Sequence, residues 1–253
     1  MNRDPKTNVL SYIAYMSHIK VGVLRGGDAD SYDLSMDMGA RVIDMLRREP
    51  YCKEYEPVDI IIDKKGVWHI SGFPVLAEKA LRHIDVVYNA LHGTYGGDGR
   101  VQHILETFHM PFTGSGAAGT IMSRDKKLTR DTLKRAGIKT PYARDLHLDH
   151  ADAIEPVAHD LFKSFPMPVV VKPRHSNSST GVSVARNFQE LVDAIDHARV
   201  YSPDIVVEEY ITGKEIISGF IEGFRDHEHY PMVPVEVRPN TKVDKHTRIF
   251  NFE

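Results

Sequence analysis

Short apolar runs rich in β-branched residues alternate with stretches of helical periodicity, and this alternation restricts the fold more than any other feature of the chain. The runs at residues 21–24, 58–62 and 85–91 are predicted strands. Between the first two, apolar residues recur at helical spacing, which predicts a helix over residues 33–47. Strands that alternate with helices favour a parallel sheet, so the N-terminal part is predicted to be a doubly wound α/β domain.

The third predicted strand leads into His92, a glycine-rich turn at residues 96–99 and then a further helix. A short run at residues 67–70 is predicted to be one arm of a hairpin. In a doubly wound domain, ligand sites lie beyond the carboxyl ends of the strands. The loop that begins at His92 is therefore a candidate for ligand contact, and a histidine that merely caps the turn is the alternative.

The chain beyond about residue 113 is predicted to form a second module of a different kind. Its predicted helices cover residues 117–122, 127–136, 151–163 and 187–198, and its predicted strands cover residues 168–171, 182–184, 205–210, 215–221 and 232–237. Two strands that flank a loop of small residues, followed by a helix and more strands, indicate an α+β module and not a second doubly wound sheet.

The composition limits the classes of function. Of the 253 residues, 42% are hydrophobic and 26% are charged, an ordinary globular balance. The 32 basic and 35 acidic residues leave a net charge of -3, which offers no global field for nucleic acid. The single cysteine, Cys52, excludes an internal disulfide. No apolar run approaches the ~20 residues of a membrane helix, and the patch at residues 9–16 lacks a signal cleavage site, so a cytoplasmic protein is expected.

The sharpest local motif is VVVKPRHSNSSTGVSV, at residues 169–184. A predicted buried strand delivers Lys172 to a loop of serine and glycine residues. Such a loop can bring backbone amides and hydroxyl groups close to a polyphosphate, while the lysine supplies positive charge. A β-hairpin with a hydrophilic loop uses the same residue types, so the motif by itself leaves both interpretations open.

A second motif, VVEEYITGKEI, ends another predicted strand at residues 206–216. Its glutamates can accept hydrogen bonds from a ribose or an exocyclic amine, and Tyr210 and Ile211 can pack on a base. An exposed strand end with solvated acids is the alternative. The glycine-rich stretches at residues 26–27 and 96–99 lack the G-x-G-x-x-G spacing of a dinucleotide fold, which disfavours a Rossmann dehydrogenase. The sequence contains no Walker A, G-x-S-x-G or H-E-x-x-H pattern.

Six segments, taken in order, resemble the D-alanine–D-alanine ligases of the ATP-grasp superfamily over nearly the whole of residues 21–253. They are VGVLRGG, VVYNALHGTYGGDGRVQHILE, MPFTGSGAAGTIMSRDKKLTRDTLKRAGIKTP, PVVVKPRHSNSSTGVS, VVEEYITGKE and VPVEVRP. Six segments in the order of the family are far more specific than any one of them. The resemblance implies an α/β fold in which a doubly wound domain precedes an α+β ATP-grasp domain and an incomplete C-terminal portion.

The resemblance also implies domain boundaries. An N-terminal extension covers residues 1–20, a doubly wound substrate domain residues 21–113, and a helical connection residues 114–139. The central ATP-grasp lid domain covers residues 140–222, and residues 223–253 start a truncated C-terminal domain.

An ATP site follows from the same resemblance. Two lysines contact the phosphates, a serine–glycine loop closes over them, hinge residues hold adenine and an acid binds ribose. Lys126 and Lys172 match the two lysines, and Ser178, Ser179 and Gly181 match the loop. Glu208, Tyr210 and Ile211 match the hinge, and Glu215 matches the acid that binds ribose.

The resemblance assigns further residues to the amino-acid substrates. His92 matches the histidine beside the first D-alanine, and Ser178 is also placed on the substrate side. The family usually has a glutamate for the substrate ammonium where this chain has Ser31, and a hydroxyl group cannot form that ion pair. Asp30 and Asp33 are the neighbouring carboxylates that could replace it.

The implied function is ATP-dependent ligation of two D-alanines to D-alanyl-D-alanine through an acyl-phosphate, for peptidoglycan precursors, cell-wall biogenesis and cell shape. The alternatives are an ATP-grasp ligase for another amino or hydroxy acid and a non-catalytic nucleotide-binding relative. The implied ligands are ATP, D-alanine and Mg²⁺, with neither nucleic acid nor membrane as a partner and a homodimer as a possible assembly. The magnesium ligands and the transition-state arginine of the family lie beyond the position of Glu253, so this chain is expected to hold no metal ligand and to be inactive alone.

Overall fold

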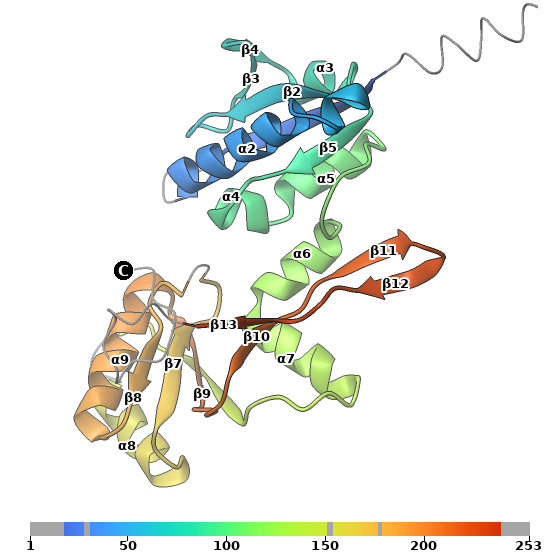
Figure 1. Ribbon diagram of the computed structural model, residues 1–253. Helices are drawn as coiled ribbons and strands as arrows, with labels where there is room; N and C mark the ends of the chain where they lie inside the picture. Colours follow the sequence, from blue (N-terminus) through green and yellow to red (C-terminus); the bar gives the residue numbers. More distant parts are fainter. Residues whose placement is uncertain (1–17, 28–30, 151–153, 177–178, 239–253) are drawn as a thin grey trace, which may run out of the picture. The chain divides into compact units, whose positions relative to one another are not determined.

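The computed structural model describes residues 18–27, 31–150, 154–176 and 179–238 (Figure 1). The chain divides into two compact units, Met1–Arg124 and Asp125–Glu253. This division falls within the predicted helical connection at residues 114–139. Of the features predicted above, most of the N-terminal extension, Asp30, Ser178 and the chain from residue 239 onward lie outside the described residues.

The first unit contains a five-stranded sheet with the order β4-β3-β2-β1-β5. Its strands are β1 (Ile19–Gly26), β2 (Tyr55–Ile62), which follows the short 3-10 helix η2 (Tyr51–Lys53), β3 (Trp68–Ile70), β4 (Phe73–Val75) and β5 (Val86–Asn89). β1 pairs in parallel with β2 and β5, whereas β3 pairs antiparallel with β2 and β4. The predicted parallel strands and the predicted hairpin arm are therefore confirmed.

Helices pack on both faces of this sheet because β1 directs apolar side chains into two cores. Val21 and Val23 pack against helix α2 (Tyr32–Leu46). Leu24 belongs to the other core, which includes residues of helices α3 (Ala77–Leu81) and α5 (Arg100–Thr107). Neighbouring residues of a strand point to opposite faces, so one strand can serve both cores. The predicted doubly wound α/β class is confirmed.

The connection after β5 differs from the prediction. Residues 96 and 97 belong to a short helix, α4 (Gly93–Gly97), so the predicted turn over residues 96–99 is wrong at its start. The chain turns at Gly99, which has a φ of 85° and forms the N-cap of α5. Glycine adopts this left-handed conformation without a steric penalty, so α5 can begin almost directly after α4. Helix α6 (Ala117–Arg124) ends the unit.

The second unit begins with helix α7 (Lys126–Arg135) and contains a four-stranded antiparallel sheet with the order β6-β9-β7-β8. Its strands are β6 (Ala143–His147), β7 (Val169–Pro173), β8 (Ser183–Ala185) and β9 (Asp204–Glu209), and helices α8 (Ile154–Ser164) and α9 (Phe188–Tyr201) pack on them. Leu161, Leu191 and Ile195 are fully buried in the shared core. The predicted α+β module is confirmed. Strand β6 was not predicted, because three of the five residues of its sequence ARDLH are polar and only the pairing with β9 defines it.

Within the described residues, four short strands follow β9. β10 (Glu215–Ile217) pairs antiparallel with β13 (Val235–Val237), and β11 (Phe220–Phe224) pairs antiparallel with β12 (His227–Pro231). The prediction of one continuous strand over residues 215–221 is therefore wrong, since Ser218 and Gly219 separate two strands that belong to different sheets.

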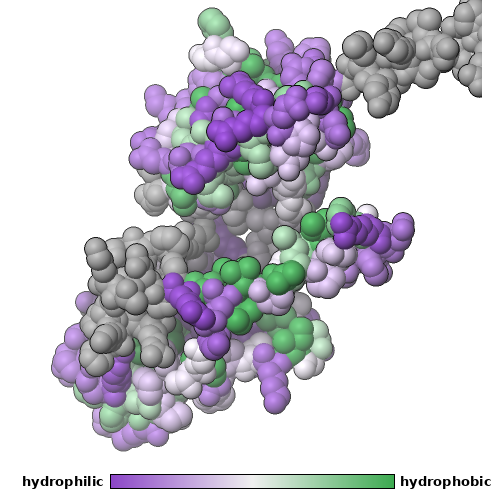
Figure 2. All heavy atoms as spheres, in the orientation of Figure 1, coloured by the Kyte–Doolittle hydropathy of each residue, from purple (hydrophilic) through white to green (hydrophobic). Residues whose placement is uncertain are grey.

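These short strands expose much of their apolar surface. Ile217 is 61% exposed and Phe220 is 62% exposed, and hydrophobic side chains of this part of the chain appear green in Figure 2. Across the residues that the structure describes, every helix is too short or too polar to cross a lipid bilayer.

Candidate functional site

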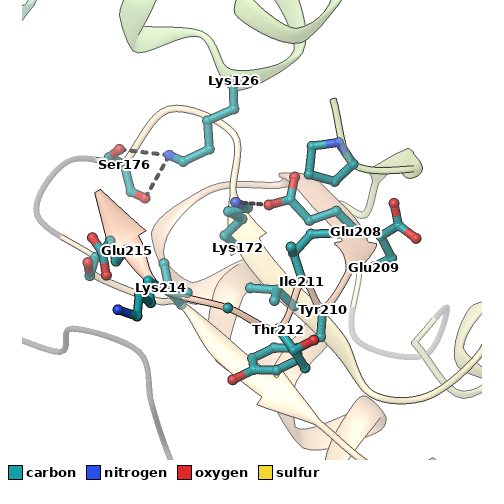
Figure 3. A pocket seen from close by; sticks show the side chains of 15 residues that line it. Lys126, Lys172, Ser176, Glu208, Glu209, Tyr210, Ile211, Thr212, Lys214 and Glu215 are labelled. Carbon is teal, nitrogen blue, oxygen red and sulfur yellow. Dashed lines mark hydrogen bonds and ion pairs between the residues drawn. The ribbon is translucent and has the colours of Figure 1, made fainter. Parts of the chain in front are cut away.

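A cavity of about 660 Å³ lies in the second unit (Figure 3). It is lined by Lys126, Pro141, Val170, Lys172, Ser176, Ser179, Val182 and residues 208–215. All of these residues belong to the same compact unit, so the cavity is defined within one body. Its volume is within the range of pockets that bind small-molecule ligands.

Strand β7 directs alternate side chains to the core and to the cavity. Val169 and Val171 are fully buried in the core, whereas Val170 and Lys172 line the cavity. Because side chains alternate along a strand, burial of the two valines forces Lys172 onto the opposite face. The apolar run of the sequence thus determines the direction in which the lysine points.

Lys172 Nζ forms an ion pair with the carboxylate of Glu208, near the end of β9 (Figure 3). Glu208 lies opposite Val170 in the antiparallel ladder, so Lys172 is its diagonal neighbour. The side chains of Lys172 and Glu208 are 22% and 15% exposed. Because both charges are largely removed from water, each needs the other as its charged partner.

Lys126 enters the same cavity from the first turn of α7 (Figure 3). Its Nζ donates hydrogen bonds to the backbone oxygen of Ser176 at 2.8 Å and to Ser176 Oγ at 3.2 Å. The preceding residue, Asp125, is the N-cap of the helix, and its carboxylate accepts hydrogen bonds from the amides of Lys127 and Leu128. This cap sets the residue at which the helix begins and hence which lysine faces the cavity.

Asp125 also forms a two-point ion pair with Arg174, the residue that follows β7. Arg174 Nε donates to Asp125 Oδ1 at 2.8 Å, and Nη2 donates to Oδ2 at 2.6 Å. These hydrogen bonds hold the pKa of the Asp125 carboxyl well below its usual range, and they raise the pKa of Arg174. The sequence reasoning missed both residues, although an aspartate directly before a predicted helix is a recognisable N-cap signal.

The segment after β9 is held at its start by backbone contacts. The amide of Tyr142 donates to Glu209 Oε1 at 2.9 Å, and the amide of Glu209 donates to the backbone oxygen of Tyr142, also at 2.9 Å. The amide of Tyr210 donates to the backbone oxygen of Pro168 at 3.3 Å. Glu209 therefore anchors this segment and also lines the cavity, together with Tyr210 and the 62% exposed Ile211.

The loop after Lys172 is described in part. Ser179 and Gly181 have positive φ angles of 60° and 73°, and the amide of Val182 donates to the backbone oxygen of Ser179 at 3.1 Å. This tight turn brings Ser179 and Val182 to the cavity wall. Ser178, predicted for both phosphate and substrate contact, lies outside the described residues.

Most of the residues predicted for the nucleotide site lie around this one cavity. Those that line it are Lys126, Lys172, Ser179, Glu208, Tyr210, Ile211 and Glu215. Gly181 is described but is not in the lining, where its neighbour Val182 takes part instead. Ser176 and Lys214 are polar lining residues that the sequence reasoning did not single out. Ser176 belongs to the serine-rich motif at residues 169–184, so the composition of that motif was the signal that could have identified it.

Apart from Ser178, the residues predicted for the amino-acid substrate belong to the first unit. Ser31 is the N-cap of α2, and its side chain makes no capping hydrogen bond. Asp33 is in the first turn of that helix and is exposed. His92 is the N-cap of α4, and its Nε2 lies 2.6 Å from Met38 Sδ. His92 therefore follows the carboxyl end of β5, the edge at which doubly wound domains bind ligands.

The described residues lack a donor set for a metal ion. Within residues 18–27, 31–150, 154–176 and 179–238, no group of three or more histidine, cysteine, aspartate or glutamate side chains is arranged to hold one.

Two families match the sequence in succession. Residues 71–115 match the family described as "D-ala D-ala ligase N-terminus", and residues 132–250 match "D-ala D-ala ligase C-terminus". The residues that line the cavity from Pro141 onward lie within the second match.

Curated relatives and a solved structure agree with these matches. A D-alanine–D-alanine ligase of Solibacter usitatus is 33% identical over 78% of this chain, which spans 58% of that protein. A D-alanine–D-alanine ligase of Clostridium botulinum is 31% identical over 90% of this chain, which spans 68% of that protein. The crystal structure of the Bacillus anthracis D-alanine–D-alanine ligase complexed with ATP is 26% identical, with a TM-score of 0.64 over 88% of this chain and 67% of that one.

Proposed function

The chain belongs to the D-alanine–D-alanine ligase family, and we propose that it takes part in the ATP-dependent ligation of two D-alanines, for peptidoglycan precursors. One observation carries this proposal. Two lysines from different elements, Lys126 on α7 and Lys172 on β7, meet the segment after β9 at a single cavity of about 660 Å³. Two ammonium groups beside a partly apolar wall suit a ligand with an anionic end and a flat base.

The lining residues fit ATP in their chemistry. Lys126 and Lys172 supply donors for phosphate oxygens. Ser176 and Ser179, from the serine-rich loop after β7, add hydroxyl groups. Val170, Val182 and Ile211 provide apolar surface for a purine. Glu208, Tyr210 and Glu215 supply acceptors for an exocyclic amine and for ribose hydroxyls. Of these residues, the family resemblance implies a role in ATP binding for Lys126, Lys172, Ser179, Glu208, Tyr210, Ile211 and Glu215.

In the proposed reaction, a D-alanine carboxylate oxygen attacks the terminal phosphorus of ATP, and ADP leaves. The amine of the second D-alanine then attacks the acyl carbon, phosphate leaves, and the amine loses a proton as the peptide bond forms. The contribution of this chain is to bind and orient ATP and to neutralise phosphate charge with Lys126 and Lys172. Lys172 is paired with Glu208, so a phosphate that binds Lys172 competes with that carboxylate.

The ATP site is tested by calorimetric titration of the 253-residue chain with ATP. Lys172→Ala should weaken ATP binding by at least about tenfold, because a charge-assisted contact to phosphate is lost. Lys163→Ala is the matched control, since Lys163 is exposed on α8 and does not line the cavity. Unchanged ATP affinity in Lys172→Ala, or equal losses in the two variants, would remove Lys172 from the site.

Ligation itself is tested with the complete gene product that contains this sequence. D-Alanyl-D-alanine should form only when ATP and D-alanine are both present, and Lys172→Ala should slow its formation by at least about tenfold. ATP binding without any dipeptide would favour a non-catalytic nucleotide-binding relative.

A ligase for another amino or hydroxy acid is the second candidate, and Ser31 favours it. Its side chain makes no capping hydrogen bond at the start of α2, and a hydroxyl group cannot form the ion pair that a glutamate would form with a substrate ammonium. Competition of D-alanine with D-serine and with D-2-hydroxy acids in the same dipeptide assay distinguishes the two. Preferential use of a substrate other than D-alanine at the first position would support this candidate.

A further inference from the structure

The ion pair between Asp125 and Arg174 connects the two lysine-bearing elements of the candidate ATP site. Asp125 immediately precedes Lys126 at the start of α7, and Arg174 lies two residues after Lys172, beyond the end of β7. We propose that Asp125 and Arg174 are positioning residues that hold the Lys126 ammonium at the phosphate side of the cavity. This inference rests on the proposed function, because the ligand that it concerns is ATP.

The carboxylate of Asp125 serves two elements at the same time. It caps α7 through the amides of Lys127 and Leu128, both at 3.0 Å, and it accepts two hydrogen bonds from the Arg174 guanidinium. The side chains of Asp125 and Arg174 are 15% and 27% exposed, so the pair is partly shielded from solvent. A two-point pair of this kind restrains both distance and orientation, which a single contact cannot do.

Backbone hydrogen bonds complete the connection. The amide of Lys126 donates to the backbone oxygen of Arg174 at 3.3 Å, and the amide of Arg174 donates to the backbone oxygen of Asp204 at 2.9 Å. The first residue of α7 is thereby attached to the end of β7, and that end to β9. The distance between the backbone atoms of Lys126 and Lys172 is therefore set by the Asp125–Arg174 pair and its flanking hydrogen bonds.

The side chain of Lys126 needs the support of these contacts because it is long and flexible. The ammonium of Lys126 reaches Ser176, two residues beyond Arg174, at 2.8 Å from the backbone oxygen. A binding group contributes most when its supporting contacts hold it in place before the ligand arrives. If the base of Lys126 were not attached to the loop that carries Ser176, the ammonium would sample positions away from the cavity.

Substitution of Asp125 by asparagine separates positioning from simple electrostatics. An asparagine keeps the N-cap, because its amide oxygen can still accept from the helix amides, but it loses the charged pair with Arg174. Removal of a negative charge beside a phosphate site should tighten ATP binding if only charge matters. Loss of positioning should weaken it, and we expect a loss of about fivefold or more.

The experiment measures the affinities of ATP and adenosine for the folded chain by calorimetric titration. Asp125→Asn should weaken ATP binding while adenosine binding stays within about twofold, because only the phosphate side is disturbed. Asp160→Asn removes the same charge from an exposed pair with Arg144 and should leave both affinities unchanged. Arg174→Lys keeps the net charge but loses the two-point geometry, so it should weaken ATP binding in the same way and serves if Asp125→Asn fails to fold.

A Lys126→Met background tests whether the pair acts through Lys126. If it does, adding Asp125→Asn to Lys126→Met should cause no further loss of ATP affinity. Equal losses with and without Lys126, or tighter ATP binding by Asp125→Asn, would overturn the inference.

A second readout requires no nucleotide. Trace acetylation followed by mass spectrometry compares the reactivity of Lys126 with that of its neighbour Lys127 in the same molecule. Asp125→Asn and Arg174→Lys should raise the ratio of Lys126 to Lys127 labelling, and an unchanged ratio would overturn the positioning role. If the ratio rises although the wild-type chain binds no ATP, the positioning of Lys126 stands and the proposed function is the part that fails.

Discussion

Gly181 illustrates, at the scale of a single residue, how the loop beside the cavity depends on both conformation and space. Its φ is 73°, in the left-handed region that disfavours side chains. A Cβ atom at this position would lie 2.6 Å from Cδ2 of Tyr201 and 2.7 Å from Cγ of Pro173. Because Pro173 directly follows Lys172, a displacement of this turn would reach the lysine that lines the cavity.

Gly181→Ala is expected to lower the free energy of unfolding by about 2–4 kcal/mol, because backbone strain and steric overlap act together. Gly137→Ala is the matched control, since Gly137 has a φ of 76° but no atom within 4 Å of the added Cβ, and should cost about 1–2 kcal/mol. Urea denaturation followed by circular dichroism measures both variants. Equal losses would show that the contacts with Tyr201 and Pro173 are unimportant.

Helix α9 shows, at the scale of an element, why the sequence was sufficient to predict a helix. Asn187 is its N-cap, and the side-chain oxygen of Asn187 accepts from the amide of Glu190 at 2.9 Å. Leu191, Ile195 and Ala198 then follow at helical spacing and are all fully buried. The cap and the apolar face thus agree locally, which is the condition under which a sequence pattern predicts structure well.

Asn187→Ala is expected to destabilise the second unit by about 1 kcal/mol, because an amide at the helix start loses its acceptor. Asn187→Ser should retain most of the stability, since a serine hydroxyl can cap in the same position. Urea denaturation measures both. A serine variant as unstable as the alanine variant would show that the amide side chain of Asn187 has a role other than capping.

At the scale of the whole molecule, each compact unit has hydrophobic cores of its own. Leu105 is fully buried in a core of the first unit, and Leu191 is fully buried in the core of the second. The cavity is formed entirely by residues of the second unit. Units with separate cores can unfold in separate transitions, and a ligand stabilises only the unit that binds it.

Differential scanning calorimetry is therefore expected to resolve two unfolding transitions. Leu191→Ala should lower one of them by an amount that corresponds to about 2–5 kcal/mol, and saturating ATP should raise that same transition. Leu105→Ala is the control and should lower the other transition. If ATP raised the transition that Leu105→Ala lowers, the nucleotide would bind outside the cavity described here.

The sequence alone determined the features that depend on neighbouring residues. The apolar runs and helical periods predicted β1, β2, β5, β7, β9 and helices α2, α5, α7 and α9, because hydrophobic burial imposes these periods locally. The motif order predicted the family, and the alternation in β7 directs Lys172 to the cavity. These inferences required no knowledge of which segments lie side by side.

Only the tertiary structure decided the features that depend on contacts between distant residues. Strand β6 is rich in polar residues and is defined by its pairing with β9. The strand predicted over residues 215–221 is two strands that pair with different partners. The ion pair of Asp125 with Arg174 joins residues 49 positions apart, and the hydrogen bond of Lys126 with Ser176 spans 50. No local period encodes such pairs, because the partners are far apart in the sequence and meet only through the tertiary fold.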